Sequence, residues 1–261
     1  KGAVIAKSMG NAFRQDATNG DSCGESGVDA EGAMSCSDRL IDTYHSLPYV
    51  IGVGALDVFN VKTTYSDVGS EIWVSGYGGQ YGLNVEWLYP GEGYSPQPTW
   101  TPALMSTDPM SCSKGSIRTG QTNNNPFDGS GVTSHPENPD CNYTSSMNGT
   151  SAAAPSIAGS LALILEANPN LTWRDVKHII ANTAAQVDTS RAYTRSGIVQ
   201  YEWETNGAGY TYHNWYGFGV MDVAAAVTMA KSYSASTLGE FKISNWIYDN
   251  DSDSITIASN A

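Results

Sequence analysis

A serine at the entrance to an apolar helix is the residue of this chain best suited to nucleophilic chemistry. Ser151 follows Asn148-Gly149-Thr150 and precedes Ala152-Ala153-Ala154-Pro155. The pattern predicts a helix that begins near Thr150, with Pro155 in its first turn, where a missing N–H costs little. Ser151 would then lie beside unpaired backbone donors at the positive end of the helix dipole. Such donors suit an oxyanion, which is what an attacked carbonyl becomes.

A second polar residue follows the first apolar strand. Residues 3–7 (Ala-Val-Ile-Ala-Lys) predict a short strand that ends in the turn Ser8-Met9-Gly10-Asn11. In α/β proteins the active residues gather at the carboxyl ends of parallel strands. Asn11 is therefore a candidate for the same site as Ser151, and the alternative is an ordinary turn asparagine.

The residues around Ser151 also carry a family resemblance. Residues 148–155 resemble the serine-nucleophile motif of subtilisin-like proteases, and residues 165–176 are similar to the kexin/furin branch of that family. Residues 216–222 (Tyr-Gly-Phe-Gly-Val-Met-Asp) resemble the segment that closes the kexin catalytic domain. The resemblance implies that Ser151 is the nucleophile and that the amide of Asn11 is the second oxyanion donor. An isolated Gly-Thr-Ser would indicate only a helix cap, and the residues around Ser151 do not match the lipase motif G-x-S-x-G.

The resemblance implies an α/β fold, the subtilisin-like three-layer fold with a parallel sheet, of which this chain holds a part. Continuous apolar runs favour buried parallel strands at residues 3–7, 49–55 and 71–76. Three helices are expected, over residues 150–167, from Thr172 onward and over residues 221–230. Thr172 and Asp175 form a capping-box pattern. The first helix is nearly all apolar, so we expect it to be buried in the centre.

The chain is expected to divide near residue 233. Residues 1–233 would be the C-terminal part of the subtilisin-like catalytic domain, and residues 234–261 a linker and the beginning of a β-rich P-domain. Alternating apolar residues at 241–247 and 254–257 are typical of antiparallel strands.

A long inserted segment interrupts the catalytic part. Residues 77–147 are dense in Gly, Pro, Asn and Ser, and only residues 103–106 resemble a strand. Loops of this length are generally functional or disordered. This one would shape the substrate cleft or dock a propeptide, an inhibitor or a chaperone, and the sequence leaves that choice open.

A serine nucleophile needs a general base, normally a histidine that a carboxylate orients. In subtilases both residues precede the strand at residue 3, in D-[ST]-G-like and H-G-T-like motifs, and neither motif occurs in this chain. Its four histidines are interpreted as surface or packing residues: His45, His135, His178 and His213. The chain is therefore expected to supply the nucleophile and the oxyanion hole only. It would be inert alone and would pair with an upstream half of the domain that carries Asp and His.

Two aspartates have a metal-binding role implied by the kexin resemblance. Asp21, in Asp-Ser-Cys, and Asp67, in Tyr65-Ser66-Asp67, match calcium carboxylates of that family. Hard oxygen ligands suit Ca²⁺, which takes about six to eight of them, so the set is incomplete. The alternative is two solvated loop aspartates.

The kexin resemblance also implies a carboxylate that recognises the P1 side chain of the substrate. Kexin-like enzymes pair a buried carboxylate of the S1 pocket with a substrate Arg or Lys, in an Asp-Gly-Tyr seven residues before an aromatic. Asp42 falls in that place relative to Tyr49, and Asp38 is the fallback because Thr43 replaces the glycine. A carboxylate paired with a guanidinium would favour a basic P1 residue.

The composition limits which partners and which cellular location are expected for this protein. The formal net charge of −13 argues against nucleic acid as a partner and favours cations and basic peptides. No apolar run approaches the roughly 20 residues of a membrane span. Four cysteines allow three pairings, of which we favour Cys23–Cys36 with Cys112–Cys141. Disulfides would indicate an oxidising compartment and a secreted protein, whereas four free thiols would indicate the cytosol.

These observations predict a serine endopeptidase that cleaves after Lys or Arg, of which this chain supplies the nucleophile and oxyanion hole. Two other classes remain open. One is a non-catalytic binding or scaffold module derived from a subtilase, and the other is a serine esterase.

Overall fold

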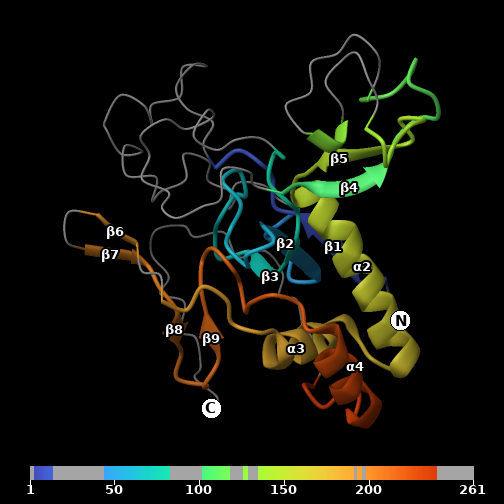
Figure 1. Cartoon of the computed structure of the whole chain (residues 1–261). Helices are drawn as coiled ribbons and strands as arrows, with labels where there is room; N and C mark the ends of the chain where they lie inside the picture. Colours follow the sequence, from blue (N-terminus) through green and yellow to red (C-terminus); the bar gives the residue numbers. More distant parts are fainter. Residues whose placement is uncertain are drawn as a thin grey trace, which may run out of the picture.

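The sheet of this protein is parallel and has three strands among the described residues. The computed structural model describes residues 3–13, 44–82, 102–117, 126–128, 135–190, 193–195 and 198–239. Its strands are β1 (Ile5–Ser8), β2 (Val50–Leu56) and β3 (Ile72–Tyr77), in the order β1-β2-β3 (Figure 1). All seven residues of β2 are buried, as expected for a central parallel strand. The carboxyl ends of the strands therefore lie at one edge of the sheet.

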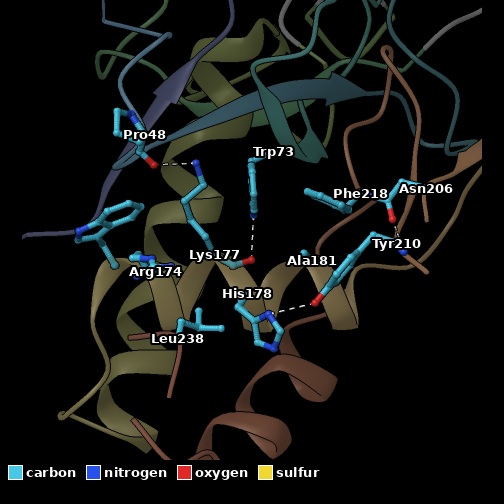
Figure 2. A pocket seen from close by; sticks show the side chains of 11 residues that line it. Pro48, Trp73, Arg174, Lys177, His178, Ala181, Asn206, Tyr210, Phe218 and Leu238 are labelled. Atoms are coloured by element: carbon cyan, nitrogen blue, oxygen red, sulfur yellow. Dashed lines mark hydrogen bonds between the residues drawn. The ribbon is translucent and has the colours of Figure 1, made fainter. Parts of the chain in front are cut away.

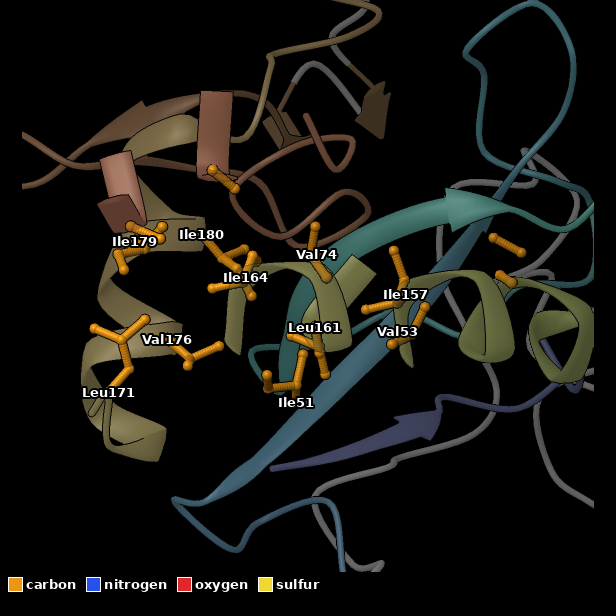
Figure 3. Close-up of a cluster of buried hydrophobic side chains, with 14 of the residues drawn as sticks. Ile51, Val53, Val74, Ile157, Leu161, Ile164, Leu171, Val176, Ile179 and Ile180 are labelled. Atoms are coloured by element: carbon orange, nitrogen blue, oxygen red, sulfur yellow. The ribbon is translucent and has the colours of Figure 1, made fainter. Parts of the chain in front are cut away.

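Helix α2 (Thr150–Ala167) contacts all three strands of the sheet. Its buried apolar residues recur every three to four positions, at Ala153, Ile157, Leu161 and Ile164. Figure 3 shows Ile157 and Leu161 beside Ile51 and Val53 of β2. This contact holds the start of α2 in a fixed position relative to the sheet.

Two further helices extend the same core. Helix α3 (Trp173–Thr183) has the predicted capping box, in which Thr172 accepts from the Asp175 N–H and Asp175 accepts from the Thr172 N–H. Helix α4 (Val223–Ser232) is capped by Asp222 and contacts both α2 and α3. Ile179 and Ile180 of α3 join the apolar cluster of α2 and β2 (Figure 3).

Short antiparallel pairs surround this core. They are β4 (Leu104–Thr107) with β5 (Tyr143–Met147), β6 (Tyr193–Arg195) with β7 (Ile198–Tyr201), and β8 (Glu204–Thr205) with β9 (Thr211–Tyr212). A short 3-10 helix, η3 (Pro126–Asp128), contacts β5. The β4–β5 pair lies near the start of α2 (Figure 1), because β5 ends three residues before that helix begins.

Within the described residues, the predicted strands and helices agree with the structure to within two residues, but two expectations about α2 were wrong. Pro155 is the sixth helical residue rather than part of the first turn, because the helix begins at Thr150. Its ring removes the N–H that would otherwise bond the Ser151 carbonyl. The helix is also only partly buried, since Leu163 is 49% exposed and Gly159 is exposed. The described elements cover one side of it.

Among the described residues, α2 is long and apolar enough to cross a membrane. Core helices of soluble proteins can have the same length and composition. Its contacts with β1, β2, β3 and α4 make it a core helix of this fold. The strands predicted at 241–247 and 254–257 lie outside the described residues.

Candidate active site

The start of α2 lies against the carboxyl edge of the sheet. Gly149 precedes the helix with φ of 114°, a left-handed conformation that favours glycine. Its N–H donates to the Tyr65 hydroxyl at 2.8 Å and to the Gly78 carbonyl at 3.1 Å. Thr150 is fully buried, whereas Ser151 is exposed. The turn therefore buries the residue on one side of Ser151 and presents the serine to solvent.

The side chain of Asn11 is bonded directly to this helix start. Its Oδ1 accepts from the Thr150 N–H at 2.9 Å and from the Thr150 hydroxyl at 3.0 Å. The Thr150 hydroxyl in turn accepts from the Gly10 N–H at 3.0 Å. Because a backbone N–H can only donate, the atom of Asn11 that faces Thr150 must be the oxygen. The Nδ2 group of Asn11 is therefore directed away from Thr150.

Two nitrogen donors lie near the position that a side chain at residue 149 would occupy. A Cβ atom built on this glycine would lie 3.3 Å from Asn11 Nδ2 and 3.6 Å from the Ser151 nitrogen. The Ser151 N–H is one of the first N–H groups of α2, which have no partner within the helix. Both nitrogens thus border one region that a larger residue at position 149 would fill. Convergent donors of this kind stabilise a developing oxyanion.

The buried loop that contains Tyr65 and Asp67 is hydrogen-bonded to the segment around Asn11. The Asp67 N–H donates to the Gly10 carbonyl at 3.1 Å, and Asp67 Oδ1 accepts from the Ala12 N–H at 3.0 Å. The Phe13 N–H donates to the Tyr65 carbonyl at 3.2 Å. Burial raises the pKa of Tyr65 to about 12, so its hydroxyl stays protonated at neutral pH and donates to the Gly78 and Gly79 carbonyls. Tyr65 therefore links the loop before Asp67 to the residue before Thr150.

Comparison with known proteins identifies the family. A model described as the subtilase family matches residues 1–219. An extracellular serine protease of Aeromonas sobria is 32% identical over 244 residues, which are 89% of this chain and 36% of the relative. The chain belongs to the subtilase family.

Further relatives of this subtilase place it with the kexin/furin-like branch. Neuroendocrine convertase 2 of Drosophila melanogaster is 43% identical over 90 residues, which are 34% of this chain and 13% of the relative. Furin-1 of Xenopus laevis is also 43% identical over 90 residues, 34% of this chain and 10% of the relative. The subtilase chain thus spans well under half the length of each of these relatives.

The fold is subtilisin-like. The crystal structure of the serine protease of Aeromonas sobria superposes with a TM-score of 0.67 at 30% identity, covering 90% of this chain and 38% of that chain. The structure of that protease with its chaperone (ORF2) gives a TM-score of 0.64 at 30% identity, covering 90% of this chain and 37% of that chain.

Among the predicted site residues, the structure brings together Ser151 and Asn11, and it places Asp67 next to them in a fully buried position. Asp21, Asp38 and Asp42 lie outside the described residues. A buried carboxylate is a suitable ligand for Ca²⁺. Within the described ranges, however, no group of three or more His, Cys, Asp and Glu side chains could hold a metal ion. Asp67 alone does not make a calcium site, and the remaining ligands would have to come from outside those ranges.

Three of the four histidines of the subtilase chain, His45, His178 and His213, take part in packing. His45 is buried, and its Nε2 donates to the Ser8 carbonyl at 2.9 Å. His178 lies on α3, with Nδ1 3.2 Å from the Tyr210 hydroxyl. His213 is 1% exposed and its Nδ1 accepts from the Trp215 N–H. Burial lowers the pKa of His213 to about 4, which keeps the ring neutral.

The inserted segment is fastened beside the site. The predicted disulfide Cys112–Cys141 is present, and Cys23 and Cys36 lie outside the described residues. Asp128 of η3 accepts from the Ser145 N–H at 2.8 Å and from the Ser146 hydroxyl at 2.8 Å. These contacts hold η3 against β5, which runs directly into Gly149 and Ser151.

Sequence reasoning missed two residues that position the site. Thr150 contacts Asn11, and Tyr65 contacts Gly149. The available signals were a threonine directly before the serine and a tyrosine in the motif of Asp67. Neither signal indicates a hydrogen-bond partner by itself, because the partners lie 139 and 84 positions away.

Proposed function

We propose that this chain supplies the nucleophile and the oxyanion-binding groups of a serine endopeptidase. The Ser151 hydroxyl attacks the carbonyl carbon of a peptide bond and forms a C–O bond, while its proton passes to a general base. The electron pair of the carbonyl moves to its oxygen. The Nδ2 group of Asn11 and the Ser151 N–H stabilise that oxyanion. The observation that carries this proposal is the convergence of both donors on the space beside Gly149.

The general base belongs, in this proposal, to an upstream part of the catalytic domain that carries the histidine and aspartate. The chain matches only 36% of the Aeromonas sobria protease, so the complete subtilase would be longer. Two surfaces in the described part suit such a partner: the edge of β1 opposite β2, and the exposed side of α2 with Leu163 and Gly159. The isolated chain is accordingly expected to be inactive. Residues 234–261 would begin a P-domain.

The proposed substrate is a peptide with a basic P1 residue. Two kinds of support bear on this: relatives named as convertases and the net charge of −13. In this proposal Asp42, or Asp38 in its place, pairs with the P1 Arg or Lys. Truncating that carboxylate should therefore raise the KM for Arg peptides far more than for apolar ones.

A structural Ca²⁺ is proposed at Asp67 and Asp21. When bound, the ion would neutralise the buried Asp67 carboxylate and stiffen the loop that supports Asn11. The protein is further proposed to be secreted, since it has a disulfide and resembles an extracellular protease. A propeptide, an inhibitor or a chaperone would dock at residues 77–147. The Aeromonas sobria protease has been crystallised with a chaperone.

The test uses Ser151→Ala in the full-length protein, with Ser156→Ala as the matched control. Ser156 is also exposed and lies on the same helix. We expect Ser151→Ala to abolish both hydrolysis of Arg-containing peptides and labelling by a fluorophosphonate, and Ser156→Ala to retain both. Full peptidase activity in Ser151→Ala would refute the nucleophile assignment.

The same assay distinguishes the rival functions. A full-length wild-type protein that resists the fluorophosphonate would be a binding or scaffold module. A wild-type protein that takes the label and cleaves simple esters, but no Arg-containing peptide, would be an esterase. Rapid cleavage of the Arg peptide is the outcome expected here.

A further inference from the structure

A pocket lies at the opposite edge of the sheet from Ser151. It has a volume of about 510 Å³, within the usual range for ligand sites, and is bounded by Pro48, β3, α3 and the turn at residues 206–210 (Figure 2). Pro48 precedes the amino end of β2, whereas Asn11 follows the carboxyl end of β1. The strands are parallel, so the two sites are at different edges. The pocket is therefore not part of the site at Ser151.

The walls of the pocket are aromatic. They include Trp73, Trp173, Tyr210 and Phe218. Trp73 and Phe218 pack edge to face with ring centroids 4.8 Å apart, and the Trp73 indole N–H donates to the Lys177 carbonyl at 2.9 Å. The Trp73 side chain is thereby fixed as a wall (Figure 2). Such a cavity favours a large aromatic side chain.

The polar groups of the pocket are cationic. Arg174, Lys177 and His178 line it, and none of the described lining residues is acidic. Lys177 Nζ donates to the Pro48 and Val50 carbonyls at 2.9 and 3.1 Å and lies 3.8 Å from the Trp73 ring centroid. Burial lowers the pKa of Lys177 to about 8. An adjacent carboxylate would favour its charged form.

The downstream chain leaves the described structure at the rim of this pocket. Leu238 is one of the lining residues, and Arg174 Nη1 donates to the Gly239 carbonyl at 3.0 Å. Residues 246–248 are Trp-Ile-Tyr, and Asp249, Asp251 and Asp253 follow them. Positions 239 and 246 are separated by seven Cα-to-Cα steps, which can span up to about 25 Å, more than enough to return to the pocket.

We propose that the pocket is the docking site of the chain's own segment 246–253, which lies outside the described residues. The Trp246 ring enters the aromatic cavity, and the aspartates that follow it pair with Arg174 and Lys177. The segment that leaves α4 is thereby fastened to α3 and β3. The choice of occupant rests on charge complementarity and on the position of Gly239, and it does not depend on the proposed protease activity.

A photoreactive benzoylphenylalanine at position 246 of the full-length protein tests the placement without weakening the pocket. We expect cross-links within the same chain to the pocket walls, such as Trp173, Ala181 or Phe218. Cross-links confined to residues remote from the pocket, or no cross-link, would overturn the proposal. Cross-links to a second copy or to another protein, recognised by mass, would also overturn it.

A double-mutant cycle gives an independent readout. Ala181→Trp fills the pocket, so it should lower Tm in the wild-type background by competing with Trp246. In Trp246→Ala the same substitution should cost much less, because the cavity is then vacant. Trp246→Ala alone should lower Tm by about 5 °C or more, whereas its neighbour Ile247→Ala serves as the matched control. Strictly additive shifts for positions 181 and 246 would contradict the assigned occupant.

Discussion

The Thr150 hydroxyl donates a 3.0 Å hydrogen bond to the side-chain oxygen of Asn11. The Thr150 N–H bonds the same oxygen at 2.9 Å, and the hydroxyl itself accepts from the Gly10 N–H. Asn11 therefore acts as the N-terminal cap that Gly149 lacks a side chain to provide. One oxygen of Asn11 caps α2, and this fixes the direction of its Nδ2 group toward the space beside Gly149.

Removing the Thr150 hydroxyl should impair catalysis without impairing binding. In Thr150→Val, one of the two bonds that orient the Asn11 amide is lost while the side-chain volume is kept. In the full-length protease we expect kcat to fall about 10-fold or more with little change in KM, because the loss acts on transition-state stabilisation. Thr150→Ser keeps the hydroxyl and should restore kcat. Full activity in Thr150→Val together with a loss in Thr150→Ser would mean that packing, not the hydrogen bond, is what Thr150 provides.

A methyl group at Gly149 should block the oxyanion space. Gly149→Ala places a Cβ 3.3 Å from Asn11 Nδ2 and imposes a left-handed φ of 114° on alanine. We expect kcat to fall by about 10²-fold or more. Gly207→Ala is the control, since nothing lies within 4 Å of its Cβ position and it lies outside the proposed surface for the upstream half. It should leave activity unchanged. Unchanged activity in Gly149→Ala would show that the region beside Gly149 does not bind the oxyanion.

Asp67→Asn should distinguish the structural role of the Asp67 side chain from its proposed role as a Ca²⁺ ligand. An asparagine keeps the oxygen that accepts from the Ala12 N–H but removes the negative charge. In the full-length protein, excess Ca²⁺ relative to chelator should raise the Tm of wild type by about 5 °C or more. The asparagine variant should show little of this shift while keeping a similar Tm in chelator. Equal calcium shifts in both proteins would exclude Asp67 as a ligand.

The buried His213 should make stability depend on pH. Its pKa is lowered to about 4 from an ordinary value near 6.5, so the unfolded state binds more protons between these two values. Stability should therefore fall as the pH is lowered from about 6.5 to about 4, and the contribution of His213 should level off below that.

The matching measurement is the Tm of wild type and His213→Asn across that range. Asparagine offers an acceptor for the Trp215 N–H but does not titrate. The variant should start with a lower Tm at pH 7 and lose less of it on acidification. A parallel pH dependence in the two proteins would assign the effect to other groups.

Local patterns predicted the elements that position the site. The apolar run at residues 49–55 indicated a buried parallel strand, which is β2 (Val50–Leu56) in the structure, and Thr172 with Asp175 marked the start of α3. The start of α2 followed from the change to small apolar residues after Gly149. Each of these signals is contained within a few residues, so the sequence displays it directly.

Other features depend on partners that the sequence does not place together. Strand β5 (Tyr143–Met147) is mostly polar and is held by β4 and Asp128, so no apolar alternation marks it. The aromatic pocket takes its walls from Pro48, Trp73, α3 and Phe218, which are far apart along the chain. The exposed side of α2 was missed because composition indicates how apolar a helix is, but not how many of its sides are covered.

The hydrogen bonds between Asn11 and Thr150 can form only after both residues have been synthesised. The two residues are 139 positions apart. At translation rates of about 5–20 residues per second, Thr150 is made several seconds after Asn11. A nascent copy of the proposed protease therefore has no oxyanion pocket during that interval and cannot digest the chains around it. This delay follows from where the two residues stand in the gene, and it requires no inhibitor.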